Sequence, residues 1–398
     1  MKIAFLTSGG IAPCLSASIA ALIQNYKKKN LDFEYIGYQH GYYGLLKGKT
    51  IPLNFQSNEE LNNLKKIGGT ILGNSRVKLT NIEDCVNNGY IKKGQKPLEV
   101  AANQLIADNV DILHTIGGDD TNTTACDLAL FLKEKGHNLT VVGLPKTIDN
   151  DVYPISQTLG ADTAAEQGAI FFENIVNENT TSRRQLIIHE VMGRNCGWLT
   201  AATAHYYRER LKSKQIFNPN GLKRSNWDIH AVYIPEQEID ISIESKRLNE
   251  IMDSYDCVNV FLSEGAGVDN IVSDLESKGT KVRRDAFGHV RLDEINPGKW
   301  YANKIADWTS AKKVLVQKSG YFARSSAPNQ NDITLINRIS EKAVDYALDK
   351  RSGVAGLSDE HNQEIKCIDF TKIKGGKPFD YKQSWYQKIL NEIGQKKG

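Results

Sequence analysis

Two short apolar runs in the first half of the chain each end in a polar motif, and this repeated pattern most strongly limits the folds available to it. The run 110–116 leads into residues 117–120 (GGDD), and the run 139–144 leads into residues 145–151 (PKTIDND). Such runs are typical of buried parallel strands. Carboxylates just beyond the carboxyl ends of parallel strands lie where open α/β sheets bind ligands. The pattern therefore predicts an α/β fold with a metal-assisted phosphoryl-transfer site at one edge of the sheet.

Strand-like and helix-like segments alternate from the start of the chain. Residues 2–6 predict a strand, residues 15–28 have the spacing of a helix, and residues 33–38 predict the next strand. A strand, a crossover helix and a second strand form the repeating unit of a parallel sheet with helices on both faces. We therefore predict a three-layer α/β domain at the beginning of the chain.

A second α/β set begins near residue 155. The polar and basic stretch 208–226 predicts an insertion or loop, and the tail 376–398, rich in Lys, Gly and Gln, is expected to be peripheral. The predicted strands are 185–190, 229–234, 257–262 and 313–317, and a further helix is predicted over 332–350.

Composition excludes several classes of protein. The chain has 398 residues, and 50 Lys and Arg against 47 Asp and Glu give a formal charge of +3. This balance argues against a nucleic-acid partner. No apolar run approaches the length of a membrane span, and six scattered cysteines without C-x-x-C spacing argue against a zinc site or a disulfide framework. We expect a cytoplasmic protein that is not bound to a membrane.

Two glycine turns are candidate phosphate-binding sites. Gly9 and Gly10 follow the first predicted strand and precede a helix, where bare backbone can approach a phosphate and the helix N-terminus attracts anions. Residues 68–76 form a second glycine-rich turn that ends at Arg76. Each turn has a plainer interpretation: a simple tight turn in the first case and a solvated arginine in the second.

Asp119 and Asp120 are adjacent carboxylates that repel each other unless a cation or hydrogen-bond donors offset their charge. Magnesium prefers carboxylate and phosphate oxygens and keeps several waters, so one protein ligand can suffice. We predict that Asp119 is a Mg²⁺ ligand. The alternative is that the two residues cap the following helix and charge its first turn.

Residues 145–151 contain candidates for the chemical step itself. A hydroxyl acceptor needs a carboxylate that takes its proton as it attacks phosphorus. Asp149 and Asp151 are two residues apart, so they would point the same way in an extended chain. Lys146 would place a positive charge beside the transferring group.

Further charged residues follow the predicted strands of the second set. Arg194 lies in a glycine turn, which suits a phosphate or sugar ligand, although an arginine paired with a carboxylate is an equal alternative. Glu264 at another strand end suits a sugar hydroxyl. Residues 287–291 and 321–324 each place an arginine beside an aromatic ring, which suits a sugar phosphate. Glu236 also ends a predicted strand and has no predicted role.

Together these motifs resemble those of the phosphofructokinase superfamily. The resemblance covers roughly residues 1–350 in the same motif order, and residues 145–151, 192–200 (MGRNCGWLT) and 263–267 (SEGAG) carry it. Diacylglycerol and NAD kinases share a GGD-type motif but would lack the TIDND and MGR elements. The resemblance implies two Rossmann-like three-layer α/β domains with the active site in the cleft between them.

The resemblance also implies which part of the chain binds which substrate. Residues 1–152, completed by part of 285–350, would bind the phosphoryl donor, residues 153–284 would bind the sugar phosphate, and residues 351–398 would form a peripheral C-terminal segment. Asp119 resembles the Mg²⁺ ligand, and Asp149 resembles the proton acceptor. Gly10, Arg76 and Lys146 are the predicted donor contacts. The predicted sugar-phosphate site comprises Thr147, Ile148, Asp149, Met192, Gly193, Arg194, Glu264, Tyr321, Phe322, Ala323 and Arg324.

Asp120 and Lys146 indicate the phosphoryl donor. ATP-using relatives usually carry glycine at both positions, whereas Asp with Lys is the pattern of the pyrophosphate-using branch. A carboxylate at position 120 would repel the α-phosphate of ATP. Lys146 would neutralise the leaving phosphate, a contribution of a few kcal/mol in a desolvated site. Asp120, Lys146 and Asp149 are therefore the predicted catalytic set.

Two further departures limit what the resemblance implies. Cys14 and Ser16 replace the usual Gly and Asn of ATP-using relatives. Residues 291–294 lack the usual Arg-Gly-Gly, so neither a role for Arg291 nor allosteric control is carried over.

We predict a reversible, Mg²⁺-dependent transfer from pyrophosphate to fructose 6-phosphate, giving fructose 1,6-bisphosphate and phosphate, by a homodimer or homotetramer. The alternatives are the same reaction with ATP, a kinase of another sugar phosphate such as sedoheptulose 7-phosphate, and a non-catalytic regulatory subunit. A regulatory subunit would have lost Asp119, Lys146 or Asp149, and all three are present.

Overall fold

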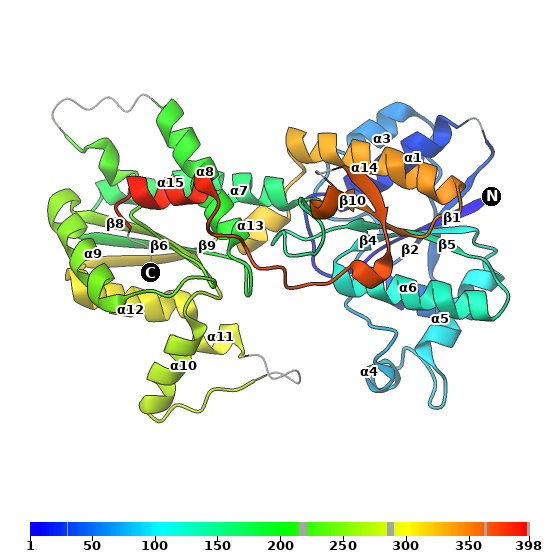
Figure 1. The fold of residues 1–398 in the computed structure, drawn as a ribbon, viewed down its shortest axis with the longest axis horizontal. Helices are drawn as coiled ribbons and strands as arrows, with labels where there is room; N and C mark the ends of the chain where they lie inside the picture. The colour runs from blue at the N-terminus through cyan, green and yellow to red at the C-terminus, as the bar shows by residue number, and fades with distance from the viewer. Residues whose placement is uncertain (30, 215–220, 285–289, 362–363, 396–398) are drawn as a thin grey trace. The chain divides into compact units, whose positions relative to one another are not determined.

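The computed structural model describes residues 1–29, 31–214, 221–284, 290–361 and 364–395, and the chain divides into two units. Unit 1 comprises Met1–Thr163 and Arg324–Lys377, and unit 2 comprises Ala164–Ala323 and Pro378–Gly398. Each unit combines a largely or wholly parallel sheet with covering helices, as the sequence predicts (Figure 1).

Unit 1 is built on a seven-stranded sheet in the order β11-β10-β5-β4-β1-β2-β3. The five inner strands are parallel, and the edge strands β3 and β11 are antiparallel to their neighbours. The strands are β1 (Lys2–Thr7), β2 (Glu34–Tyr38), β3 (Thr50–Pro52), β4 (Ile112–Gly117), β5 (Thr140–Pro145), β10 (Gly353–Leu357) and β11 (Ile365–Ile368). Both faces of β1, β4 and β5 are buried, which explains why these strands are mainly apolar.

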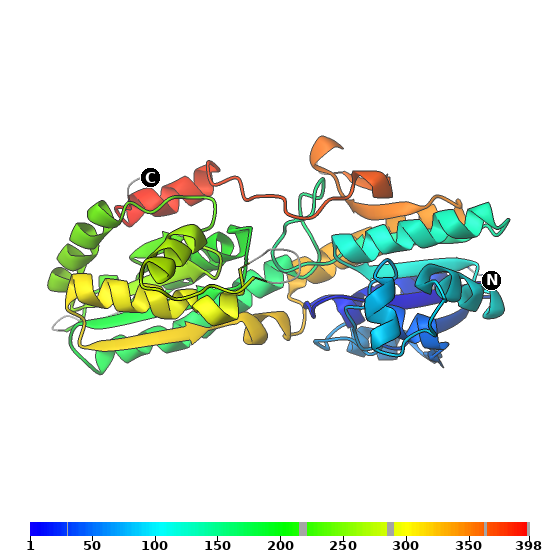
Figure 2. The ribbon, with the colours of Figure 1, turned by 90° about the horizontal axis from the view of Figure 1, so that it is seen from below.

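Helices cover both faces of this sheet (Figures 1 and 2). One face carries α1 (Leu15–Lys27), α3 (Asn58–Leu64) and α14 (Gln330–Leu348), and the other carries α2 (Tyr42–Lys47), α5 (Pro97–Ala107) and α6 (Asp119–Glu134). The short elements are α4 (Ile82–Asn87) and the 3₁₀ turns Asp359–His361 and Phe370–Lys372.

Unit 2 is built on the parallel sheet β7-β8-β6-β9. Its strands are β6 (Gln185–Val191), β7 (Ala231–Tyr233), β8 (Cys257–Ser263) and β9 (Lys313–Lys318). Successive residues of β6 face opposite sides, so Leu186 and Ile188 join one core while Ile187 joins the other.

The first of these cores lies beneath α9 (Ile241–Tyr255), α10 (Val268–Ser277), α11 (Leu292–Ile295) and α12 (Pro297–Thr309). The second lies beneath α7 (Ala161–Ile175), α8 (Trp198–Ser213) and α15 (Ser384–Glu392). The remaining elements are α13 (Gly320–Arg324) and the 3₁₀ turns Val176–Thr180 and Arg224–Asn226. No helix in these described parts of the chain combines the length and the apolar character needed to cross a membrane.

The stretch 208–226 differs from the predicted loop. Its first six residues continue α8, and 215–220 lie outside the described residues. Arg208 is buried and pairs with Asp228 and Glu392 at 2.9 and 2.6 Å. The charge of Arg208 can be buried within a helix because its partners neutralise it. Local composition does not reveal such partners.

The C-terminal segment 351–398 also differs from the peripheral position predicted for it. All five residues of β10 are buried, and β10 pairs with β5 inside the sheet of unit 1. α15 packs into a core of unit 2 through Tyr386, Ile389 and Leu390. The observed boundaries at Thr163, Ala323 and Lys377 also differ from the predicted ranges 1–152 and 153–284. The donor and sugar-phosphate labels of the two parts stay predictions.

Val354 tests whether β10 is part of the core. It is fully buried opposite Gly143 of β5, so Val354→Ala should lower the free energy of unfolding by about 1–3 kcal/mol through lost burial and a cavity. Urea denaturation measures this. The control is Leu130→Ala on α6, a side chain that is 54% exposed, which should change stability by less than about 0.5 kcal/mol. Equal small effects would contradict a structural role for β10.

Candidate active site

The carboxyl ends of β1, β4 and β5 meet at one edge of the sheet in unit 1. The register sets Gly117 of β4 opposite Pro145 of β5, and the Lys146 N–H donates to the Gly117 carbonyl at 2.9 Å. Ile116 pairs with Thr7 of β1. The glycine turn after β1, the GGDD motif and the PKTIDND motif therefore leave the sheet side by side, as the sequence predicts.

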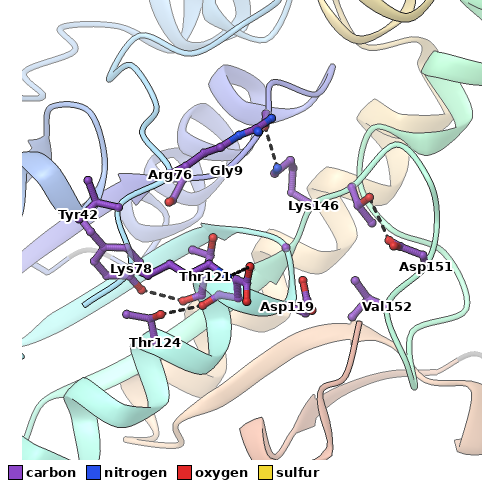
Figure 3. Close-up of a pocket in the computed structure, with 16 residues that line it drawn as sticks. Gly9, Tyr42, Arg76, Lys78, Asp119, Thr121, Thr124, Lys146, Asp151 and Val152 are labelled. Atoms are coloured by element: carbon purple, nitrogen blue, oxygen red, sulfur yellow. Dashed lines mark hydrogen bonds and ion pairs between the residues drawn. The ribbon is translucent and has the colours of Figure 1, made fainter. Parts of the chain in front are cut away.

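A cavity of about 410 Å³ lies at this edge, and Figure 3 shows the side chains around it. Its lining combines three cations with three carboxylates. These are Arg76, Lys78 and Lys146, and Asp119, Asp120 and Asp151. Gly10 and Thr147 also line the cavity, so every residue predicted to contact the donor or the metal lies here. A small, highly charged anion with a bound cation suits this lining.

Lys146 is held against the first glycine turn. Its side chain is only 5% exposed, and its Nζ donates to the Gly10 carbonyl at 2.8 Å. Burial lowers the pKa of Lys146, and the nearby Arg76 acts in the same direction, whereas the Asp149 and Asp151 carboxylates oppose the shift. Gly9 has a φ of 82°, which favours glycine, so this turn lets the ammonium group come close to the backbone.

The two adjacent carboxylates occupy different surroundings. Gly118 precedes α6 without a capping side chain, and Asp119 and Asp120 lie in the first turn, where the helix dipole favours negative charge. Asp120 is 66% exposed and pairs with Lys78 at 2.8 Å. In the described part of the chain, the Asp119 carboxylate accepts no hydrogen bond and forms no ion pair. Its oxygens therefore remain open to a cation in the cavity.

Lys78 is a charged residue of this cavity that sequence reasoning missed. A signal was present, because Lys78 follows Arg76 by two residues and side chains alternate along an extended chain. Tyr42 was also missed. Its hydroxyl donates to the Thr121 carbonyl at 2.7 Å and fixes the first turn of α6.

The loop 146–151 is a bend and not the extended segment predicted from the sequence. Asn150 has a φ of 55°, so the segment is not extended, and the geometry from which we predicted that Asp149 and Asp151 point the same way is absent. The Thr147 hydroxyl donates to Asp151 Oδ1 and accepts from the Asp149 N–H, both at 3.2 Å. Thr147 and Asp151 line the cavity, whereas Ile148 and Asp149 are not among its lining residues.

Unit 2 brings together a second group of predicted residues. The register sets Val191 of β6 opposite Ser263 of β8, and Glu190 opposite Lys318 of β9, so these three strands end at one edge. Residues 192–194, Glu264 and α13 follow these ends. The Ser263 hydroxyl donates to the Gly193 carbonyl at 2.5 Å.

Close glycine contacts hold this second group together. A Cβ on Gly265 would collide with the Arg194 carbonyl, and one on Gly320 would lie 2.8 Å from Met192 Cε. Gly193 itself has a φ of 127°. Tyr321 and Phe322 on α13 are 74% and 48% exposed, whereas Ala323 is buried. The last residue of α13, Arg324, belongs to unit 1.

Glu236 acquires a structural explanation that the sequence did not provide. Both oxygens of its carboxylate accept the Gly197 N–H, at 2.9 and 3.0 Å, and Oε1 also accepts the Phe379 N–H at 2.8 Å. Glu236 therefore fixes the end of the glycine turn that carries Arg194. Because Phe379 is 143 residues away from Glu236, no local pattern could have revealed this.

Glu264 lies at the end of β8 in surroundings that favour its neutral form. Burial raises the pKa of Glu264, and the nearby Glu190 carboxylate adds to the shift, while a hydrogen bond from the Gly193 N–H opposes it.

The predicted 287–291 motif is described only in part, because residues 287–289 lie outside the described residues. Its Arg291 directly precedes α11 and pairs with Glu294 of that helix at 3.1 Å.

Comparison with known proteins places this chain among close relatives. A family model described as phosphofructokinase matches residues 2–347. A protein from Methylomonas methanica, described as pyrophosphate--fructose 6-phosphate 1-phosphotransferase, is 53% identical across all of this chain and 97% of its own length. A protein of the same description from Mastigamoeba balamuthi is 49% identical, with coverage of 100% and 97%.

Solved structures show the same fold. A pyrophosphate-dependent phosphofructokinase from Marinobacter aquaeolei matches with a TM-score of 0.71 and 19% identity, covering 100% of this chain and 93% of its own. Pichia pastoris phosphofructokinase matches with a TM-score of 0.69 and 21% identity, covering 98% of this chain and 39% of its own. The predicted two-domain α/β fold is thereby confirmed.

The pKa of Asp151 leads to a test by protein stability. Burial raises this pKa, and Asp119 adds to the shift, although the Thr147 hydroxyl opposes it. A carboxyl whose pKa is raised in the folded state lowers stability as the pH rises through that pKa. Asp151→Asn should therefore increase the melting temperature at pH 8, and the gain should shrink towards pH 4. Thermal unfolding of both proteins between pH 4 and pH 8 measures this gain in melting temperature. A gain that is constant with pH would contradict the raised pKa of Asp151.

Proposed function

Because the chain belongs to the phosphofructokinase family, we propose that it catalyses the reversible transfer of a phosphoryl group from pyrophosphate to the 1-hydroxyl of fructose 6-phosphate. The products are fructose 1,6-bisphosphate and phosphate. The observation that carries the proposal is full-length similarity, at 53% and 49% identity, to proteins described as carrying out this reaction. The cavity of unit 1 supports it independently.

Three cations and an exposed carboxylate support pyrophosphate as the donor. Arg76, Lys78 and Lys146 line one cavity of about 410 Å³ together with three carboxylates, so this lining suits a small anion that carries a bound cation. Asp120, paired with Lys78, would meet the α-phosphate of a nucleotide and repel it. ATP as donor is the alternative that this carboxylate disfavours.

Asp119 suits a magnesium ion. Its carboxylate is open to the cavity, and Asp151 is close enough to affect and be affected by its charge. Oxygen ligands of this kind suit Mg²⁺, which keeps several waters and needs few protein ligands. When bound, Mg²⁺ would offset the charge of the pyrophosphate oxygens and orient them.

Asp149 is proposed as the general base. Its carboxylate would accept the proton of the 1-hydroxyl while a bond forms between that oxygen and the near phosphorus of pyrophosphate. The bond from this phosphorus to the bridging oxygen breaks, and the second phosphate leaves with the bonding electrons. The Lys146 ammonium would stabilise the developing charge on this leaving group. The reverse reaction uses the same groups by microscopic reversibility. It should run readily because the donor and product phosphates have similar transfer potentials.

In unit 2, the turn residues after β6 and β8 are the proposed contacts of the sugar phosphate. Arg194 suits the phosphate, and Glu264 suits a sugar hydroxyl. This set does not distinguish fructose 6-phosphate from a longer sugar such as sedoheptulose 7-phosphate.

We further propose that the protein acts in glycolysis and gluconeogenesis in the cytoplasm as a homodimer or homotetramer.

Asp149→Asn tests the chemical step. The amide cannot accept a proton, so kcat should fall about 10²–10⁴-fold while the KM values for both substrates change little. A coupled assay with Mg²⁺, pyrophosphate and fructose 6-phosphate measures this. A rate within a few-fold of the wild type would refute Asp149 as the base.

Asp120 and Lys78 test the choice of donor. The wild type should turn over with pyrophosphate and not with ATP. Asp120→Gly should admit ATP, because the repulsive carboxylate is gone. It should also raise the KM for pyrophosphate about tenfold, because Lys78 loses the ion pair that positions it. Lys78→Met should weaken pyrophosphate binding similarly but leave ATP excluded. Wild-type activity with ATP alone, or ATP use by the Lys78 variant, would overturn the donor assignment.

A further inference from the structure

A segment near the C-terminus runs along residues 151–155 of unit 1, directly after the proposed base Asp149. We call residues 374–379 the strap. Tyr153 and Lys374 exchange two backbone hydrogen bonds, at 2.8 and 3.0 Å, and the Lys377 N–H donates to the Asp151 carbonyl at 2.8 Å. The Lys377 ammonium donates to the Ile155 carbonyl at 2.8 Å and pairs with Asp359 at 2.5 Å. The strap backbone is thus fixed against residues 151–155.

These bonds press Gly375 against the Asp119 carboxylate. A Cβ added to Gly375 would lie 2.6 Å from Asp119 Cγ and closer still to Oδ2, distances that real Cβ atoms essentially never show. The φ of Gly375 lies outside the left-handed region, so its backbone would accept alanine. The Asp119 carboxylate is therefore the group that a side chain at position 375 would displace.

The contact with Gly375 limits the directions in which the Asp119 carboxylate can point. Within the described residues, the carboxylate has no hydrogen bond or ion pair that would choose its rotamer. Steric contact with the strap backbone limits its rotation instead. A ligand held in one orientation before the metal arrives loses less conformational entropy on binding.

We propose that Gly375 is a positioning residue for the metal-binding carboxylate of Asp119, with the strap as the element that holds it in place. This inference rests on the proposed function, in which Asp119 binds Mg²⁺. It gives the strap a part in metal binding, whereas the sequence pattern suggested only a peripheral tail.

The other end of the strap has an anchor of its own. The Phe379 N–H donates to Glu236 Oε1 at 2.8 Å, and the Phe379 ring is buried in unit 2 against Trp385 and Tyr386. The Glu236 carboxylate also holds the Gly197 N–H. Within unit 1, the bonds of Lys374 and Lys377 to residues 151–155 are what keep the strap backbone from retreating from an enlarged residue 375.

Gly375→Ala tests the inference by direct metal binding. In the presence of pyrophosphate and the absence of sugar phosphate, Mn²⁺ binding measured by electron paramagnetic resonance should weaken about 10–100-fold, the usual effect of disturbing the support of a ligand. The concentration of Mg²⁺ for half-maximal activity should rise in parallel, with the KM for fructose 6-phosphate unchanged. The matched control is Gly376→Asn. Among the described residues, a Cβ added there would have no neighbouring atom within 4 Å, and asparagine tolerates the φ of 76°. It should bind Mn²⁺ like the wild type.

Asp119→Asn separates metal binding from the positioning of the ligand. If this variant keeps wild-type Mn²⁺ binding, the proposed metal role fails. If it loses binding while Gly375→Ala binds Mn²⁺ normally, only the positioning role fails.

Stability provides a second readout in case Gly375→Ala folds poorly. In an Asp119→Ala background the clash is absent, so Gly375→Ala should cost much less stability there than in the wild type, as urea denaturation would show. An equal cost in both backgrounds would overturn the contact as the cause.

Discussion

The register between β4 and β5 is the constraint on which the candidate donor site depends. By setting Gly117 opposite Pro145, it ends two parallel strands at the same level, and the bond from the Lys146 N–H to the Gly117 carbonyl extends this alignment one residue into the loop. A register shifted by one residue would turn the side chains of one strand to the opposite face. Asp119 and Lys146 would then no longer face a common cavity.

Within that cavity, charges of both signs are kept apart by different means. Lys146 is buried against a backbone carbonyl, Asp120 is exposed and paired with Lys78, and Asp119 is left without a partner among the described residues. These three arrangements suit, in turn, the stabilisation of a leaving group, the repulsion of a nucleotide and the binding of a cation. Adjacent residues 119 and 120 can differ in this way because the first turn of α6 directs successive side chains about 100° apart.

Sequence reasoning located most of the fold and of the site because both depend on local patterns. The strands β4, β5, β6 and β8 are short, mainly apolar runs that are buried throughout, and the motifs after them contain the predicted site residues. It failed where a contact joins distant parts of the chain. Arg208 was assigned to a loop because its surroundings in the sequence are polar and basic, and the sequence does not show that Asp228 and Glu392 neutralise it in the fold. β10 was assigned to a peripheral segment because its partner β5 lies about two hundred residues earlier.

The sequence by itself determined the α/β class, most of the central strands and the residue types at their ends. These follow from short-range periodicity and from the glycine turns that parallel strands require. Only the tertiary structure decided which groups meet: Lys78 with Asp120, Glu236 with Gly197 and Phe379, and Gly375 with Asp119. The reason is that side-chain pairing across a fold is set by packing and register, which combine segments that no local pattern relates.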